Sequence, residues 1–324
     1  MSDEKKNLSK MNEGDPISGS LVVERMDLKI SSTNKFFIDI DLRGATAKLN
    51  GKVWDNAQVI YNKIKDSKVV TVKGVLTKYK DQFQIKIEKI ESYSGDEVIF
   101  IEQTMPRSTN DFDEMKNEFL GFINSIQDPH LNKLLNEIFS SDDGVKFFKS
   151  PAGKSWHHAY LSGLLEHTLE IIKICDLMAS FHKEVKRDIL LSGAMLHDFG
   201  KIIELSSEPG FEYTDTGKFV GHIVLAVLFV DRTIKEKFTD FPSPLKDQLF
   251  HVILSHQGKL EYASPVEPKT IEAIILYQAD ELSAKTNAYK QAITKGRNEG
   301  SKWTRPLPLA NNNSLFIPED FEIQ

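Results

Sequence analysis

The sequence predicts a multidomain protein in which an all-β barrel precedes an all-α domain. Residues 17–91 alternate apolar and polar side chains in short runs separated by Gly, Asn and Asp, which is the period of β-strands. Beyond residue 100 the apolar side chains recur at helical spacing. A chain of 324 residues is long enough to bury two hydrophobic cores.

The points where these patterns change set the expected domain boundaries. Residues 1–12 are polar and lack periodicity, so we expect a flexible tail there. Four further segments follow along the chain: the β-rich domain (13–100), a charged linker (101–125), the helical domain (126–296) and an extended C-terminal segment (297–324). The sequence contains no internal repeat, so neither domain is expected to be a repeat array.

The β-rich domain is expected to be a small barrel. The stretches SGSLVVERMDLKI, KFFIDIDLRGATAKLN and KVVTVKGVLTKYKDQFQIKIEKI predict four or five strands. The intervening stretch VWDNAQVIYNKIK predicts a short helix between the third and fourth strands. This strand count with an inserted helix fits an OB-fold, a barrel that commonly binds nucleic acid, whereas the helix argues against an SH3-like barrel.

The barrel also mixes aromatic residues with cations. Single-strand-binding surfaces do so because bases stack on rings while phosphates meet Lys or Arg. The residues of these two kinds are Phe36, Phe37, Arg43, Lys48, Trp54, Tyr79 and Phe83. Strand alternation predicts that about half of the aromatic residues lie in the core. Residues 1–100 carry 17 Lys and Arg against 15 Asp and Glu, whereas the whole chain has a net charge of −6, so a phosphate-rich partner would favour this domain.

The helical domain shows apolar spacing typical of buried helix faces. The expected helices cover 131–139, 159–181, 185–199, 221–234, 245–256 and 270–285. Several of these faces carry a His or Asp among aliphatic residues. These polar residues are His167, His197, Asp198, His222, His256 and Asp280. One such residue alone is usually a hydrogen-bonded core residue, but six ionisable groups buried together would be very costly without a compensating cation.

The six residues therefore predict a divalent-metal centre. Their nitrogen and oxygen ligands, in a chain with the single cysteine Cys175, suit a borderline or hard ion such as Mn²⁺, Co²⁺, Fe²⁺ or Mg²⁺, with Zn²⁺ as a further alternative. Of these we expect Mn²⁺ or Co²⁺. His197 and Asp198 are adjacent, so their side chains project about 100° apart on an ideal helix. Asp198 could therefore bridge two ions. Lys201 follows three residues after Asp198, which brings its ammonium to the same helix end.

The order and spacing of these residues resemble the H…HD…D signature of the HD-domain phosphohydrolases. The matching residues are His167, His197, Asp198 and Asp280, and the stretch HDFGK is similar to the HDxGK variant of the signature. The histidines of Gly221-His222 and Ser255-His256 resemble two additional histidines of members with two metals. A barrel placed before such a domain resembles the YhaM-type 3′→5′ exoribonucleases over nearly the whole chain.

The resemblance implies a metal-dependent phosphodiesterase that hydrolyses single-stranded RNA from its 3′ end to nucleoside monophosphates. It also implies ligand sets for two ions. One ion would be held by His167, His197, Asp198 and Asp280, and the other by His222, His256 and a bridging Asp198. Lys201 would neutralise a phosphate oxygen in the transition state. A structural alternative for Lys201 is a cation placed favourably near a helix C-terminus.

Three more residues are candidates for substrate binding. Lys154, His157 and His158 precede the helix that carries His167 and could line the substrate entrance. Adjacent side chains do not share a helix face, so at most one of the two histidines is expected to point to the site. The alternative is a solvated loop at the start of the helix.

Other function classes remain open from the sequence. A small cyclic or polyphosphorylated nucleotide is an alternative substrate, single-stranded DNA is another, and a non-catalytic RNA-binding protein is the alternative outside enzymes. A homo-oligomer is also left open. We expect no membrane segment and no secretory signal, because no apolar stretch is long enough and the N-terminus MSDEKKNLSK is polar. Together with the lone cysteine, this favours a cytoplasmic protein.

Overall fold

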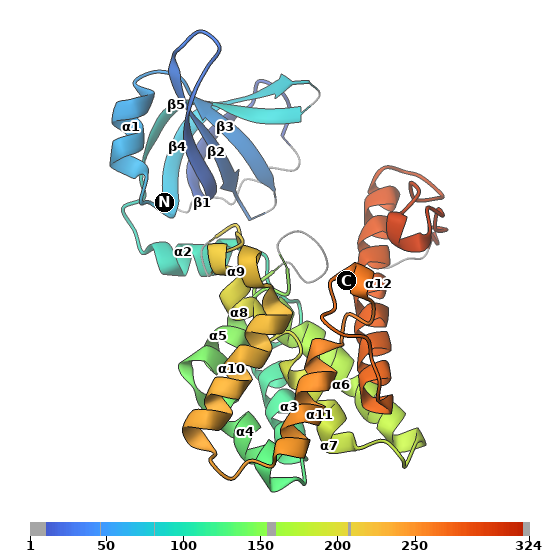
Figure 1. Cartoon of the computed structure of the whole chain (residues 1–324). Coiled ribbons are helices and arrows are strands. Elements are labelled where there is room, and N and C mark those ends of the chain that lie inside the picture. The colour runs from blue at the N-terminus through green and yellow to red at the C-terminus, as the bar shows by residue number, and fades with distance from the viewer. Residues whose placement is uncertain (1–10, 46, 81, 154–159, 207–208, 320–324) are drawn as a thin grey trace. The chain divides into compact units, whose positions relative to one another are not determined.

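A computed structural model describes residues 11–45, 47–80, 82–153, 160–206 and 209–319 (Figure 1). The chain divides into two compact units, each with its own core. The first unit contains Met1–Pro106 together with Ser206–Glu212, and the second contains Arg107–Leu205 and Tyr213–Gln324. The multidomain class predicted from the sequence, a β-barrel before a helical domain, is therefore confirmed.

In the described residues of the first unit, five strands form a closed barrel in the order β1-β2-β3-β5-β4. The strands are β1 (Pro16–Ile30), β2 (Phe36–Arg43), β3 (Lys48–Val53), β4 (Val69–Tyr79) and β5 (Gln82–Ser92). Neighbouring strands are antiparallel except β3 and β5, whose parallel pairing closes the barrel. Helix α1 (Ala57–Ile64) connects β3 to β4, where the sequence predicts it.

Strand alternation separates an aliphatic core from a polar outer face. In β2 the side chains of Ile38, Ile40 and Leu42 are fully buried, while Asp39 and Asp41 between them face outward. The expectation that about half of the aromatic candidates are core is wrong. Those residues are exposed or half-buried, because Ile, Val and Leu fill the barrel interior instead.

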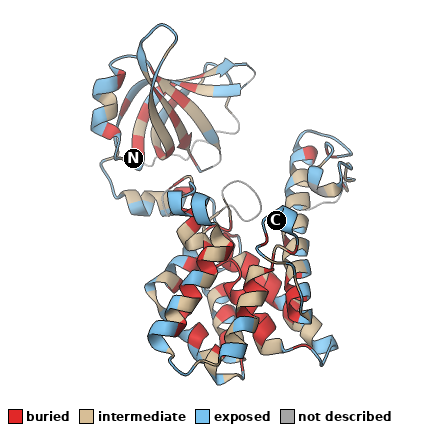
Figure 2. Ribbon diagram, in the orientation of Figure 1, coloured by how far each residue is buried: buried red, intermediate tan, exposed pale blue. Residues whose placement is uncertain are grey.

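Helix α2 (Glu97–Thr104) completes the first unit, and the second unit is helical, as predicted. Its helices are α3 (Phe112–Asn124), α4 (Pro129–Ser140), α5 (Asp142–Lys149), α6 (Gly163–Phe181), α7 (Arg187–Leu196), α8 (Lys201–Glu204), α9 (Asp215–Val220), α10 (His222–Lys237), α11 (Ser243–Leu254) and α12 (Ile271–Asn298). Their buried faces point toward one another, as the red ribbon segments of Figure 2 show.

An aromatic cluster anchors the middle of this helical unit. Phe119 of α3 contacts Phe139 of α4 at a ring-centroid distance of 4.7 Å. Phe199 stacks on Phe147 of α5 at 5.6 Å and contacts Phe229 of α10 at 4.6 Å. Because Phe199 directly follows Asp198, the turn after α7 is fixed in the core by its own side chain.

The segment predicted as a linker, 101–125, is not one along its whole length. Residues Phe112–Asn124 form α3, and Met115, Phe119 and Ile123 are buried at intervals of four residues. That spacing is helical, but many charged residues between them obscured it.

The C-terminal region also differs from the prediction of an extended segment. Helix α12 continues to Asn298, and Trp303 pairs with Phe316 in an isolated β-bridge. Ile317 is buried and lies over Gly296, where a Cβ would approach its Cδ1 to 2.5 Å. The chain after α12 therefore folds back on that helix.

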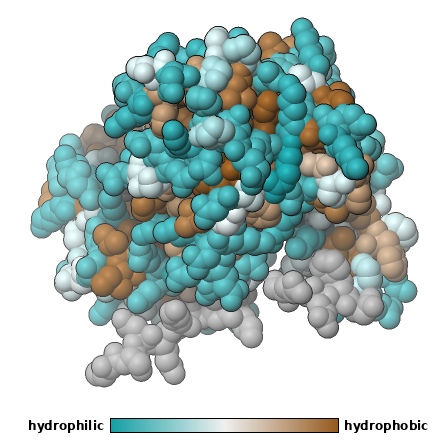
Figure 3. Space-filling view, turned by 90° about the horizontal axis from the view of Figure 1, so that it is seen from below, coloured by the Kyte–Doolittle hydropathy of each residue, from teal (hydrophilic) through white to brown (hydrophobic). Residues whose placement is uncertain are grey.

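Most of the surface seen in Figure 3 is hydrophilic, with apolar side chains scattered between. Among the described residues, no helix combines the length and hydrophobicity that crossing a membrane requires.

Candidate metal centre

Six residues from five segments of the helical unit come together. His167 lies on α6 and Asp280 on α12, while His197 and Asp198 follow α7, His222 begins α10 and His256 follows α11. The described residues contain two groups whose ligand atoms lie within 4.8 Å of one another: His167, His197 and Asp280, and Asp198, His222 and His256. All the residues that the sequence singled out as ligands therefore belong to one of these groups.

Asp198 lies between the two groups. Its Oδ2 is 3.5 Å from Nε2 of His167 and 3.4 Å from Nε2 of His197. Its Oδ1 is 3.3 Å from Nε2 of His222 and 3.9 Å from Nε2 of His256. Each carboxylate oxygen thus faces a different group, which is the arrangement that a bridging carboxylate needs.

Two of the histidines are held by the helices they terminate. Nδ1 of His197 donates to the carbonyl of Ala194 at 2.7 Å, and Nδ1 of His256 donates to the carbonyl of Ile253 at 2.7 Å. Carbonyls in the last helical turn lack intrahelical partners, so a side chain three residues later can satisfy them. A carbonyl only accepts, so the proton is on Nδ1 and the lone pair is on Nε2, which points into the centre.

Glu204 holds a third histidine, and the sequence analysis missed it. Its Oε1 accepts from the backbone N–H of His222 at 3.0 Å and from Nδ1 of the same residue at 3.1 Å. Burial raises the pKa of the Glu204 carboxyl, but the bonds to His222 lower it below its usual value, so the group is ionised. The available signal was its position three residues after Lys201, on the same side of α8.

Several buried atoms of the centre lack hydrogen bonds. Within the described part of the chain, Nε2 of His197, His222 and His256 and Oδ1 of Asp198 have no hydrogen-bond partner. Such atoms are costly to bury unless something compensates them. Imidazole nitrogens together with carboxylate oxygens are a donor set for divalent transition-metal ions, so these residues fit such an ion.

The charges of the centre favour a cation. Burial raises the pKa of the Asp198 carboxyl, but Lys201 and His197 hold it well below its usual range. Burial lowers the pKa of His167, but the hydrogen bonds and charges of Asp198 and Asp280 raise it to about 9. Burial and neighbouring His197 lower the pKa of His256 to about 3. The carboxylates therefore stay ionised and His256 stays neutral as a ligand requires, whereas His167 is protonated without metal, so a cation would displace its proton.

Lys201 lies beside the bridging position. Its Nζ is 2.6 Å from Oδ2 of Asp198. Burial lowers the pKa of this ammonium, but Asp198 raises it above its usual value, so Lys201 is charged. The structure thus brings Lys201 to the centre through an ion pair, and its predicted contact with a phosphate oxygen stays a prediction.

Gly200 explains the fourth letter of HDFGK. A Cβ built on Gly200 would lie 2.0 Å from the carbonyl oxygen of His222 and 2.8 Å from the backbone nitrogen of Ala226. Only glycine lets the turn after α7 touch the first turn of α10 in this way. Gly221, with φ of 76°, then admits the backbone turn that starts α10 at His222.

The substrate-binding candidates Lys154, His157 and His158 lie outside the described residues. Another histidine, which the sequence analysis left unassigned, has a local role: Nε2 of His251 accepts from the backbone N–H of Lys269 at 2.9 Å.

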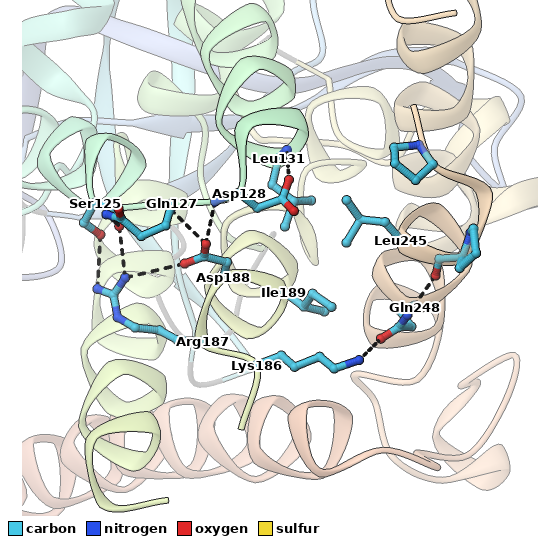
Figure 4. A pocket seen from close by; sticks show the side chains of 12 residues that line it. Ser125, Gln127, Asp128, Leu131, Lys186, Arg187, Asp188, Ile189, Leu245 and Gln248 are labelled. Atoms are coloured by element: carbon cyan, nitrogen blue, oxygen red, sulfur yellow. Dashed lines mark hydrogen bonds and ion pairs between the residues drawn. The ribbon is translucent and has the colours of Figure 1, made fainter. Parts of the chain in front are cut away.

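A pocket of about 790 Å³ in the helical unit has none of these ligands among its lining residues (Figure 4). Its polar groups bind one another: Nζ of Lys186 donates to Gln248 at 2.7 Å. Oδ2 of Asp188 accepts from the backbone N–H groups of Gln127 and Asp128 at 2.8 Å and 2.7 Å. Because these polar groups already have hydrogen-bond partners, the pocket is a weaker candidate than the centre for binding a charged ligand.

The outer face of the barrel presents a stacked aromatic pair. The rings of Phe37 and Trp54 lie 4.7 Å apart at an angle of 21°. Nζ of Lys52 lies 5.5 Å from the centre of the Phe37 ring. By contrast, the phosphate-binding candidates Arg43 and Lys48 both pair with the buried carboxylate of Glu24, which compensates part of their combined charge.

Comparison with family models agrees with both units. A model described as an HD domain matches residues 164–285, which include all of the candidate ligands. A model described as an OB-fold nucleic acid binding domain matches residues 22–93. HD domains are metal-dependent phosphohydrolases, so the pairing supports a hydrolase that acts on nucleic acid.

Proposed function

We propose that this chain, which joins an OB-fold nucleic-acid-binding domain to an HD domain, is a 3′→5′ exoribonuclease of the YhaM type. It would hydrolyse single-stranded RNA to nucleoside monophosphates. The observation that carries the proposal is Asp198, whose two carboxylate oxygens face two separate groups of ligand atoms. Two such positions that share a carboxylate suit hydrolysis of a phosphodiester, in which both the attacking and the leaving oxygen need stabilisation.

The residues of the centre would divide the work. Divalent ions, when bound, supply Lewis acidity toward a water nucleophile and the phosphate oxygens. His167, His197, Asp198 and Asp280 would hold one ion, and Asp198, His222 and His256 the other. The charged ammonium of Lys201 adds positive potential beside Asp198, where an anionic phosphate would bind.

The barrel would hold the single strand. The stacked rings of Phe37 and Trp54 offer an aromatic platform on which a base can stack without regard to sequence. Lys52 over the Phe37 ring and the exposed Lys86 of β5, its partner in the parallel pairing with β3, would leave cations within reach of the backbone phosphates. Arg43 and Lys48 would contribute less to this surface, because both pair with Glu24.

The direct test uses the purified full chain, freed of metal and supplied in turn with Mn²⁺, Co²⁺, Mg²⁺ and Zn²⁺. Its substrates are single-stranded RNA labelled at the 5′ end, single-stranded DNA, a cyclic dinucleotide and nucleoside triphosphates. The proposal expects a ladder of 5′-labelled RNA that shortens one nucleotide at a time, with nucleoside monophosphates as products. Turnover of the cyclic dinucleotide or the triphosphates without RNA cleavage would reject it in favour of a small-nucleotide hydrolase.

The role of the barrel predicts a selective defect in Trp54→Ala. Trp54 lies outside the barrel core, so its removal should leave the fold intact and cost only the ring contact with Phe37. Losing one stacking partner should weaken RNA binding by about 1–3 kcal/mol, which is roughly 5- to 150-fold. Turnover of a minimal phosphodiester such as bis(p-nitrophenyl) phosphate should stay unchanged. Fluorescence anisotropy with labelled RNA measures the affinity.

The matched control is Phe181→Ala, which removes another exposed aromatic ring, at the end of α6 in the other unit. Equal RNA affinity of Trp54→Ala and Phe181→Ala would show that the aromatic platform does not bind the substrate.

A further inference from the structure

The histidines of the centre are oriented in two different ways. His197 and His256 donate Nδ1 to carbonyls of their own helices, and no side-chain substitution removes those acceptors. His222 and His167 instead depend on side chains from other elements, Glu204 and Ser283. Each group of ligands contains one histidine of each kind.

From this division we propose that each cation position has its own positioning residue. Glu204 orients His222 for the position formed with Asp198 and His256, and Ser283, backed by Glu170, orients His167 for the position formed with His197 and Asp280. The proposal rests on the proposed function, because it assumes that both positions bind cations.

Glu204 makes two contacts with His222. A single carboxylate oxygen accepts both the backbone N–H and the ring Nδ1–H of His222, at 3.0 Å and 3.1 Å. These two bonds fix the ring about its side-chain torsions and hold its proton on Nδ1. Nε2 then carries the lone pair and lies 3.3 Å from Oδ1 of Asp198.

Ser283 on α12 makes the corresponding contacts with His167 and Glu170. The hydroxyl of Ser283, which is buried, donates to Oε2 of Glu170 at 2.7 Å. Nδ2 of Asn287 donates to the same oxygen at 3.2 Å, so that oxygen is an acceptor. The hydroxyl has one hydrogen, and Glu170 receives it. Ser283 Oγ can therefore only accept from Nδ1 of His167, at 3.2 Å, which leaves Nε2 as the nitrogen that would bind a cation once it has given up its proton.

The positioning residues Glu204 and Ser283 belong to different parts of the helical unit. Glu204 ends α8, which follows the turn that carries Asp198, whereas Ser283 lies one helical turn after Asp280 on α12. Removing the partner that orients a metal-binding imidazole typically weakens metal binding by roughly 10–100-fold. Removal of Glu204 or of Ser283 should therefore weaken cation binding at one position and leave the affinity of the other position unchanged.

The test titrates the metal-free full chain with Mn²⁺ and measures free Mn²⁺ by electron paramagnetic resonance, without substrate. The parent should bind two equivalents. Ser283→Ala and Glu204→Ala should each keep one equivalent at parental affinity and weaken the other roughly 10–100-fold. Glu170→Ala should weaken the same equivalent as Ser283→Ala. Glu204→Gln should bind nearly as the parent does, because its amide oxygen still accepts from His222.

The decisive variant combines Ser283→Ala with Glu204→Ala. If the two residues serve different positions, both equivalents become weak, whereas one equivalent at parental affinity in the double variant would overturn the proposal. Thr233→Ala and Glu272→Ala are the controls. They remove a hydroxyl bonded to the Phe229 carbonyl and a buried carboxylate bonded to the Lys186 N–H, and both should bind as the parent does.

The outcomes separate this proposal from the proposed function. Two equivalents in the parent with unchanged single variants would reject the positioning roles alone. A parent that binds no Mn²⁺ would reject both proposals. RNA hydrolysis by the parent, measured beside the titration, shows whether the proposed function stands by itself.

Discussion

Asp198→Asn is expected to lose both cations and nearly all hydrolytic activity. Its carboxylate faces both sets of ligand atoms, through Oδ2 on one side and Oδ1 on the other. The amide is the same size but carries no charge, and its NH₂ group is a donor where a ligand lone pair is required. The loss of activity should exceed the roughly 10–100-fold typical of removing an outer hydrogen-bond partner.

Metal analysis and RNA hydrolysis of the purified variant measure this effect. Asp231→Asn makes the same chemical change where the carboxylate pairs with Lys235 on α10, and it should keep both metal and activity. Lys201→Ala should keep the cations and slow the reaction, since an ammonium stabilises phosphate charge without binding a metal. An Asp198→Asn protein that retains its metal and full activity would contradict the assignment of the centre.

Gly200→Ala is expected to damage the centre without removing any ligand. The added methyl would lie 2.0 Å from the carbonyl oxygen of His222, and backbone atoms cannot rotate away as a flexible side chain could. The first turn of α10 must shift, and His222 with it. Overpacking of this kind costs about 1–3 kcal/mol of folding free energy. We therefore expect a lower midpoint of thermal unfolding, weaker binding of one Mn²⁺ and reduced hydrolysis.

Gly121→Ala is the matched control for this substitution. Gly121 lies in α3, and a Cβ there would meet no atom within 4 Å. Alanine is favoured over glycine inside a helix by roughly 0.5–1 kcal/mol, so this variant should be as stable as the parent or more so, with full activity. Equal behaviour of the two variants in thermal unfolding and metal binding would show that the contact between Gly200 and His222 is unimportant.

The sequence was most informative where a residue type conflicts with its surroundings. His167 lies among aliphatic residues, and the pair His197-Asp198 ends an apolar run. Both features predicted that these polar side chains meet, and the structure brings them together. The barrel could be predicted equally well. The alternation of apolar and polar residues indicates the strands, and the helical pattern of the stretch before β4 indicates α1. Both predictions depend on the periodicity of apolar residues, which can be read from one sequence alone.

Hydrogen-bond and ion-pair partners that come from elements distant along the chain could not be predicted in this way. Glu204 and Ser283 have no unusual local sequence, and only the packing of α8 against α10 and of α12 against α6 gives them a histidine to orient. Arg43 and Lys48 illustrate the same limit. Their charges suggest phosphate binding until the fold brings Glu24 of β1 between them. The sequence specifies which side chains are present, but the partner of each depends on elements distant along the chain.

The most direct test of the account is a crystal structure of the parent grown with Mn²⁺ and measured at a wavelength where manganese scatters anomalously. The account predicts two anomalous peaks, one beside Oδ2 of Asp198 among His167, His197 and Asp280, and one beside Oδ1 among His222 and His256. A single peak, or two peaks that do not share Asp198, would contradict a centre built around this carboxylate.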